Sequence, residues 1–354
     1  MNSKSVLRTI VLLGLCFLQS ACYYVQATRG QIEVLTKREP IDEILASPDT
    51  TEELGRRLRL VQDARRFSVD ELALPDNKSY RSYSDLERDF VVWNVFAAPE
   101  FSLDAREWCY PIVGCVSYRG YFSEEAAYRE ADKLSGKGFD VAVGGVPAYS
   151  TLGNFNDPVL NTMMRWDDVK LVSTLFHELA HQVLYIKDDT AFNESFATAV
   201  EEIGIERWLA AKGRQDDMAN YRAQKALHRR LVELVSAAKV DLAGYYAGDV
   251  GADVMRQLKS ARLEQLSSDV RVELRAAGRS ENHWLTGDLN NARLLPMSLY
   301  DAQVPAFLTL YDDCGSELEC LYDEAGKIAK LDPVAMQERL DALADGQAAK
   351  TRGD

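Results

Sequence analysis

The sequence predicts an α+β fold, in which a small β-sheet packs on a mainly helical body. Between residues 90 and 150, short apolar runs alternate with turn residues, as they do in strands. From about Asp168 onward the chain is rich in Ala, Leu, Arg and Glu, which favour helices. With 354 residues, of which 47% are hydrophobic, the chain can bury a large core.

The N-terminal segment has the features of an export signal. Lys4 and Arg8 give a basic start, and Ile10–Leu18 is an apolar stretch too short to cross a bilayer. Small residues precede Cys22, which resembles the cleavage site of a bacterial lipoprotein. We therefore expect residues 1–21 to be a lipoprotein-type signal peptide and Cys22 to become the lipidated first residue. The alternative is a plain signal peptide followed by an incidental cysteine.

The expected location follows from this signal. We expect the protein on the periplasmic side of the bacterial envelope, touching a membrane only through the lipid on Cys22. Tyr23, rather than aspartate, follows the cysteine, and by the same resemblance this indicates the outer membrane. The formal net charge of −14 repels nucleic acid and anionic membranes, so neither is expected as a partner.

Four cysteines lie beyond Cys22, in two close pairs. Cys109 pairs by proximity with Cys115, and Cys314 with Cys320. In an exported protein this spacing favours two small-loop disulfides, although four cysteines allow three connectivities. A second zinc site is the alternative, but neither pair has a CxxC spacing or a nearby histidine.

Helices are expected over residues 23–80, where Thr50 or Thr51 can cap a helix with a 3.6-residue apolar period. Val91–Phe96, Ile112–Tyr121 and Phe139–Val146 then read as strands. Between the last two strands, the segment from Ser123 to about Gly136 reads as a helix, which gives a small sheet with one crossing helix.

The most specific motif lies between Leu171 and Gln182. No Gly or Pro interrupts this mostly apolar segment, which therefore predicts a helix. His177 and His181 are four residues apart, so both imidazoles lie on one helical face and can bind one cation. Glu178 lies beside that cation and can take a proton from zinc-bound water. This is the H-E-x-x-H arrangement of zinc peptidases, and the alternative is a buried helix with two hydrogen-bonded histidines.

A catalytic zinc site needs a third protein ligand and leaves its fourth position for water or substrate. A polar break follows His181, and a second helix would bring Glu194 back against the first. His-Glu-Leu-Ala-His followed by Asn-Glu-Ser-Phe-Ala resembles the gluzincin clan of zinc peptidases. The resemblance implies a gluzincin-like core in which Glu194 is the third ligand of one zinc ion.

Over most of the mature chain, the sequence also resembles a family of bacterial aminopeptidases that are exported and often lipoprotein-like. The likeness is carried by Tyr149–Pro158 before the zinc helix, Asp189–Ala197 after it, and Asn290–Ala292 further on. It implies the removal of N-terminal amino acids from peptide substrates.

The expected organisation is one zinc peptidase domain over residues 22–345. Within it, residues 23–167 supply helices and the small sheet, and residues 168–345 are helical. Residues 346–354 are expected to form a disordered tail.

Several polar residues near the motif are further candidates. Glu201 and Thr198 share a helical face with Glu194, and either could orient a zinc-bound histidine. Glu201 could equally be an exposed surface carboxylate. Asp188 and Asp189 could also support the site, but we expect them to cap the second helix.

Catalysis also requires a donor for the developing oxyanion. Tyr300 is the first choice, with Tyr149 and His283 behind it. A substrate could pair with Val143–Tyr149 if this segment is an exposed edge strand. The alternative is an ordinary strand that ends in a turn.

Recognition of a free α-amino group usually needs a carboxylate near the zinc. The Gly-x-Met-Glu-Asn motif of the large zinc aminopeptidases is absent, and Glu201 or Asp157 could substitute for it. We therefore expect an aminopeptidase with Glu178 as the general base. The alternatives are a zinc endopeptidase with the same core and a non-catalytic zinc-binding envelope lipoprotein.

Overall fold

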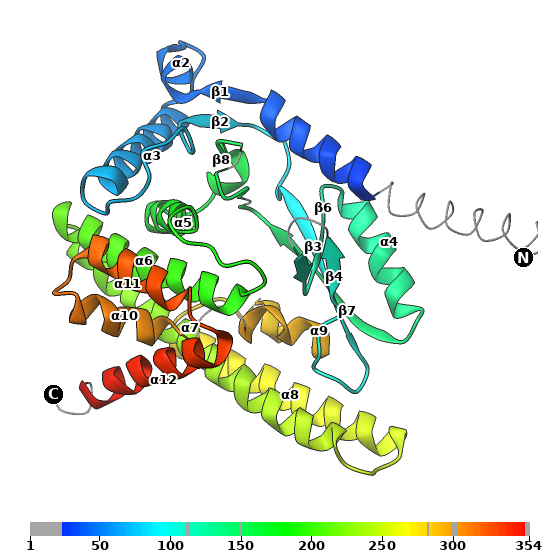
Figure 1. Cartoon of the computed structure of the whole chain (residues 1–354). Coiled ribbons are helices and arrows are strands. Elements are labelled where there is room, and N and C mark those ends of the chain that lie inside the picture. Colours follow the sequence, from blue (N-terminus) through cyan, green and yellow to red (C-terminus); the bar gives the residue numbers. More distant parts are fainter. Residues whose placement is uncertain are drawn as a thin grey trace, which may run out of the picture.

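The protein has the α+β fold that the sequence predicts (Figure 1). The computed structural model describes residues 23–110, 114–148, 150–153, 155–281, 283–298 and 303–350. Small sheets of two or three strands lie in the N-terminal half, and helices dominate the C-terminal half.

The N-terminal part combines helices with a three-stranded sheet. Residues 23–36 are helical, and α2 (Ile41–Ala46) and α3 (Glu52–Asp70) follow. Thr51 caps α3 by accepting a hydrogen bond from the Leu54 amide, as one of the two predicted caps. The sheet has the strand order β1-β2-β8, made of Arg38–Pro40, Ser82–Ser84 and Val159–Leu160.

A second sheet carries the predicted crossing helix. β3 (Val92–Pro99) lies in its centre, and β6 (Arg119–Tyr121) and β7 (Phe139–Val146) pair antiparallel with it. α4 (Glu124–Ser135) packs against β3 and β7, and Ser123 caps its first turn. The order β6-β3-β7 leaves β7 at an edge of the sheet.

One strand prediction is wrong. Of the predicted strand Ile112–Tyr121, residues 112 and 113 lie outside the described residues. Gly114–Val116 forms β5 and pairs with β4 (Trp108–Tyr110), whereas Arg119–Tyr121 belongs to the other sheet. A disulfide joins Cys109 to Cys115, which are directly opposed in the β4–β5 hairpin. This covalent link holds β5 to β4 and separates it from β6.

The second predicted disulfide, between Cys314 and Cys320, is also present. Both predicted cysteine pairings are therefore confirmed. Because both pairs are oxidised, their sulfur atoms are not free to form a second zinc site.

Most of the C-terminal half is a helical body. α5 (Asp168–Ala180) and α6 (Thr190–Ala211) pack against each other, and α10 (Val304–Asp313) packs against α6. The rings of Phe192 and Phe196 contact that of Phe307 at 5.1 and 5.6 Å between centroids. The remaining helices of this body are α11 (Leu318–Ile328) and α12 (Pro333–Lys350).

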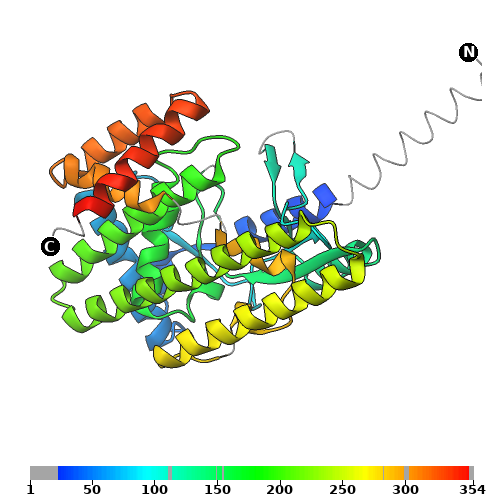
Figure 2. The same cartoon turned by 90° about the horizontal axis from the view of Figure 1, so that it is seen from below.

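Two long helices form an antiparallel pair along one side of the molecule (Figures 1 and 2). They are α7 (Gln215–Tyr246) and α8 (Ala252–Ala276). Short helical turns lie elsewhere along the chain, at η1 (Asn161–Met163), η2 (Trp284–Thr286), α9 (Asn291–Leu294) and η3 (Pro296–Ser298).

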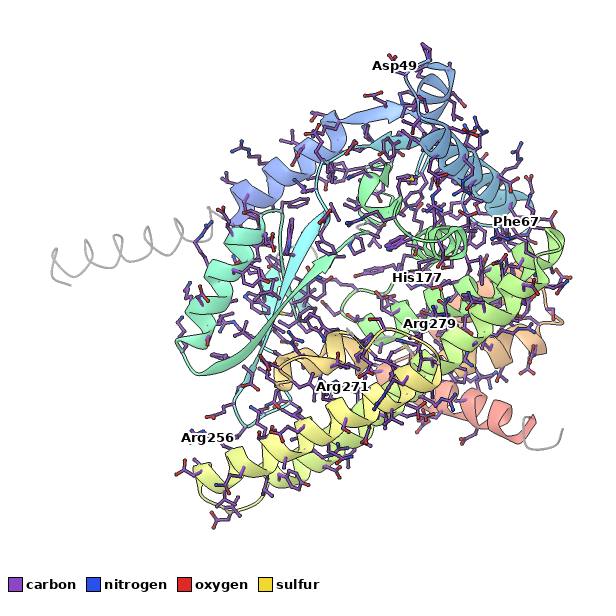
Figure 3. All side chains as sticks on the ribbon, turned by 180° about the vertical axis from the view of Figure 1, so that it is seen from behind. Asp49, Phe67, His177, Arg256, Arg271 and Arg279 are labelled. Atoms are coloured by element: carbon purple, nitrogen blue, oxygen red, sulfur yellow. A yellow bond between two sulfur atoms is a disulfide. The ribbon has the colours of Figure 1, made fainter. Side chains whose placement is uncertain are left out.

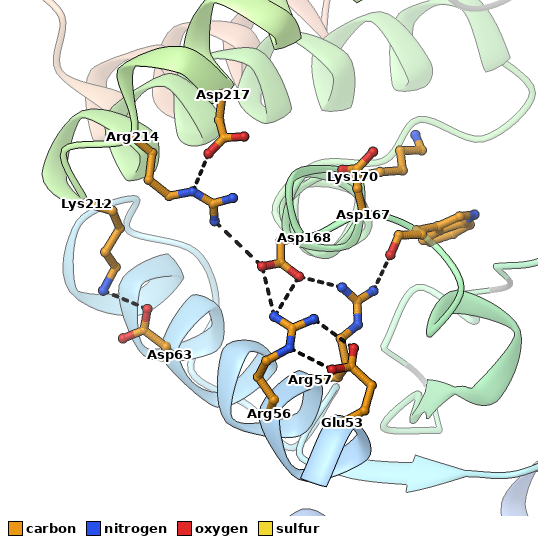
Figure 4. Close-up of polar contacts among 11 residues, drawn as sticks. Glu53, Arg56, Arg57, Asp63, Asp167, Asp168, Lys170, Lys212, Arg214 and Asp217 are labelled. Carbon is orange, nitrogen blue, oxygen red and sulfur yellow. Dashed lines mark hydrogen bonds and ion pairs between the residues drawn. The ribbon is translucent and has the colours of Figure 1, made fainter.

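An ion-pair network fixes the start of α5 to its neighbours (Figure 4). Asp168 accepts hydrogen bonds from Arg57 at 2.5 Å and from Arg56 at 3.1 Å, both on α3. Arg57 is buried and also donates to the Trp166 carbonyl at 2.6 Å. Arg214, just before α7, lies 3.9 Å from Asp168. The helix that carries both motif histidines is thereby anchored to α3.

The chain ends differ in part from the prediction. Residues 1–22, with the predicted signal peptide and Cys22, lie outside the described residues. α12 continues to Lys350, so residues 346–350 of the predicted tail are helical, as their Ala, Gln and Lys content favours. In the described ranges, no helix is both long and apolar enough to cross a bilayer.

Candidate metal centre

α5 places His177 and Glu178 at the end of a well-defined helix. Asp167 caps its start by accepting a hydrogen bond from the Lys170 amide at 2.8 Å. Leu171, Leu175 and Phe176 are fully buried on its apolar side. The last turn therefore presents His177 near the middle of the molecule (Figure 3), Glu178 follows it in the same turn, and His181 is the C-cap.

α6 places Glu194 in its first turns. Asp189 caps this helix by accepting a hydrogen bond from the Phe192 amide at 3.0 Å, so the predicted capping role is confirmed for Asp189. Asn193 fixes the loop before the helix through two hydrogen bonds with the backbone of Ile186, each 2.7 Å long. The asparagine beside Glu194 thus holds the connection between the two helices.

The three predicted ligands converge. One nitrogen of each histidine and one carboxylate oxygen of Glu194 all lie within 4.8 Å of one another. Glu194 lies 3.3 Å from Nε2 of His177 and 3.7 Å from Nε2 of His181. A tetrahedral zinc ion with bonds of about 2.1 Å would space its ligand atoms about 3.4 Å apart. The side chains present therefore fit a zinc ion.

Glu201 orients His177 from the opposite side of its ring. Its carboxylate lies 3.2 Å from Nδ1 of His177 and 3.4 Å from Nζ of Lys225. Burial would raise the pKa of Glu201, but Lys225 and the hydrogen bond with His177 hold it well below its usual range. Glu201 is 7% exposed, so the alternative of a surface carboxylate is wrong. Glu201 lies two helical turns after Glu194 on α6, so both side chains are on the same, inward-facing side of the helix.

The two imidazoles differ in pKa. Burial lowers the pKa of His177, but hydrogen bonds with Glu194 and Glu201 outweigh it and raise the value to about 10. Burial, together with the charge on His177, lowers the pKa of His181 to about 4. His177 thus lies in a field that favours positive charge, and a cation bound at Nε2 would take the place of its proton.

Glu178 faces the loop at residues 150–153, where the Ser150 hydroxyl lies near its carboxylate. Burial raises the pKa of Glu178 to about 7, although the charge on His177 opposes this. A carboxylate with this pKa can accept and return a proton near neutral pH.

Asp157 does not fit the predicted role of amine-binding carboxylate. It is 2% exposed, and its carboxylate accepts hydrogen bonds from the amide and hydroxyl of Thr151 at 2.8 and 2.7 Å. It thereby holds the loop that carries Ser150. Glu201, the other candidate, is committed to His177 and Lys225.

Two of the three oxyanion candidates, Tyr300 and Tyr149, lie outside the described residues. His283 caps η2, where its Nδ1 accepts a hydrogen bond from the Leu285 amide at 3.2 Å. Thr198 is buried on α6, on the same side as Glu201.

The β7 edge is partly covered. Asn290 donates to the Val141 carbonyl at 2.9 Å, and Trp284 lies so close to Gly144 that an added Cβ would be 3.2 Å from its ring. Asn291 donates to the carbonyls of Pro99, Glu100 and Ser102. The asparagine pair therefore ties neighbouring segments together, and pairing of a substrate with the rest of the edge stays a prediction.

Sequence reasoning missed Tyr185. Its side chain is 49% exposed, and its ring lies 6.4 Å from that of His181 between centroids. Burial and the nearby charges of Glu194 and Asp188 raise its pKa. No periodic pattern marks it, because α5 ends at Ala180 and Tyr185 lies in the connection to α6.

Comparison with known proteins gives one family. A family model described as "Putative aminopeptidase" matches residues 22–343. Curated proteins give no match, and neither do solved structures.

Proposed function

The chain belongs to this family, and we propose that it is a zinc-dependent aminopeptidase of the gluzincin type. In this proposal His177, His181 and Glu194 hold the metal, and Cys22 anchors the exported protein to the outer membrane by a lipid. The observation that carries the proposal is the convergence of three ligand atoms beside the half-buried carboxylate of Glu178.

The donor set supports zinc over the harder divalent cations. Two imidazole nitrogens and one carboxylate oxygen are typical of catalytic zinc, whereas Mg²⁺ and Ca²⁺ prefer oxygen ligands alone. When bound, zinc would supply a Lewis acid for the peptide carbonyl and would lower the pKa of a coordinated water.

Glu178 carries the proton transfers. Its carboxylate accepts a proton from the attacking water and returns it to the departing amine. Ser150 lies beside this carboxylate, and its hydroxyl donates to Asp157 at 3.3 Å, which fixes the position of Ser150. Glu201 fixes the His177 ring so that Nε2 stays directed at the metal position.

The Glu178→Gln variant tests the mechanism. Because glutamine keeps the shape but cannot accept the proton, kcat should fall about 10²- to 10⁴-fold while the zinc content stays unchanged. Glu206→Gln is the matched control, since Glu206 lies on α6 and pairs with Arg222 at 2.9 Å, away from the triad. Full activity in Glu178→Gln would refute the assigned base.

A peptide panel separates aminopeptidase from endopeptidase activity. The proposal predicts stepwise release of the N-terminal residue from free peptides and no cleavage of their N-acetylated counterparts. Internal cleavage of the blocked peptides would favour the endopeptidase alternative instead.

A further inference from the structure

A cavity of about 500 Å³ lies between α5, α6, α7 and η3. Its wall carries two lysines, Lys170 on α5 and Lys225 on α7, together with His228 of α7. The buried side chains of Ser173 and Thr198 also line it. A cavity of this size can hold a small ligand or a few residues of a peptide.

The cavity lies next to the proposed metal centre. Ser173 precedes His177 by four residues on α5, and Thr198 follows Glu194 by four residues on α6. Each therefore shares a helical face with its ligand, about 6 Å further along the helix. Glu201 lies in the wall of the cavity and lies 3.2 Å from Nδ1 of His177. The cavity and the proposed metal centre thus have Glu201 as a common wall.

The two acidic side chains in the wall already have partners. Asp167 caps α5 by accepting a hydrogen bond from the Lys170 amide at 2.8 Å, and the helix N-terminus offsets its charge. Glu201 lies between His177 and Lys225, whose Nζ is 3.4 Å away. The charge that remains for a ligand in this cavity is therefore positive.

Lys170 is the cation best placed to receive that ligand. It projects from α5 away from Asp168 and the arginine partners of Asp168 (Figure 4). Its Nζ lies 5.9 Å from the centre of the Trp166 ring, and no carboxylate in the described part of the chain forms an ion pair with it. A carboxylate in the cavity would gain a charged hydrogen bond from this ammonium group.

We propose that this cavity binds the C-terminal carboxylate of a short peptide whose first peptide bond lies at the metal. The inference rests on the proposed aminopeptidase function and names its substrate class. Lys170 precedes His177 by seven residues, which is about 10 Å along α5. An extended peptide advances about 3.3 Å per residue, so about three residues span this distance. The preferred substrates are therefore peptides of about two to four residues with a free C-terminus.

Lys170→Gln tests the carboxylate site. For the wild type, kcat/KM for trialanine should exceed that for trialanine amide about tenfold, mainly through KM. Lys170→Gln should reduce this preference about fivefold or more, while the zinc content and cleavage of the amide stay unchanged. Lys212→Gln is the matched control, because Lys212 pairs with Asp63 at 2.7 Å just after α6, outside the cavity. It should keep the full preference.

Gln224→Trp tests the cavity itself. Gln224 is exposed on α7 and lines the cavity, so an indole at this position fills space without removing a buried side chain. KM for trialanine should rise about tenfold or more, with the zinc content unchanged. An unchanged KM in this variant would contradict binding of the peptide in the cavity.

Calorimetry separates this inference from the proposed function. Measured on the zinc-loaded Glu178→Gln protein, trialanine should bind about tenfold more tightly than its amide, and a further Lys170→Gln change should remove most of the difference. Equal affinities for the two ligands, or a difference that survives the loss of Lys170, would overturn this inference alone. A wild-type protein that cleaves no peptide would instead overturn the proposed function, and the binding measurement would still test the cavity.

Discussion

Replacing Glu201 by glutamine should weaken zinc binding, although Glu201 is not itself one of the proposed metal ligands. The substitution keeps the shape of the side chain but removes the charge that lies 3.2 Å from Nδ1 of His177. Glu201 carries its negative charge at all working pH values, because Lys225 holds its pKa far below the usual range. The hydrogen bond to His177 is therefore a charged one.

Charged hydrogen bonds contribute about 1.5–3 kcal/mol, which corresponds to about a 10- to 150-fold change in affinity. Glutamine can still accept one hydrogen bond from Nδ1, so the expected loss is at the lower end, about tenfold. The assay is competition for zinc against a chelator of known affinity. At saturating zinc, activity should largely return, because Glu201 acts on the metal only through His177.

Glu202→Gln is the matched control. Glu202 is the next residue on α6 and also pairs with Lys225, at 3.3 Å, but it does not contact His177. The zinc affinity of the Glu202→Gln variant should equal that of the wild type. Unchanged zinc affinity in Glu201→Gln, or equal weakening in both variants, would refute the reasoning.

Two further predictions concern pH and stability. Because a protonated Glu178 cannot accept a proton, activity should fall as the pH drops through about 7, or somewhat lower if bound zinc reduces this pKa, and a pH profile of kcat/KM measures it. Asp168→Asn should cost about 3 kcal/mol of unfolding free energy, because it leaves the buried charge of Arg57 without its carboxylate partner. Asp63→Asn breaks only the more exposed pair with Lys212 and should cost less than about 1 kcal/mol, so similar losses in the two denaturation curves would contradict this account.

Local patterns in the sequence predicted several local features of the structure. The four-residue spacing of His177 and His181 requires only a helix, and α5 supplies it. The helix caps Thr51 and Asp189 were predictable because a capping side chain bonds to an amide only three residues further along the chain. The disulfide pairs were also predictable, since each joins cysteines six residues apart.

What the sequence left open depends on contacts between distant segments. Glu201 could be exposed or buried until α7 brought Lys225 against it. Asp157 was a plausible amine ligand until the fold of its own loop turned it toward Thr151. Gly114 packs closely against Asp188, and no periodic pattern in the sequence predicts a contact between residues so far apart.

The expected strand at Ile112–Tyr121 failed for a related reason. Its apolar and aromatic residues favour extended structure, and two parts of it, Gly114–Val116 and Arg119–Tyr121, are strands. Which neighbour each half pairs with is set by the disulfide of Cys115 and by the register of β6 against β3. Strand propensity carries no information about that choice.

The most direct test of the central claim is the zinc content of the purified protein, measured by elemental analysis after dialysis, for the wild type and for Glu194→Ala. We predict about one zinc ion per chain in the wild type and almost none in the variant, because two imidazoles alone hold zinc weakly. A wild-type chain without zinc, or a variant that keeps it undiminished, would show that these three side chains do not form the metal site.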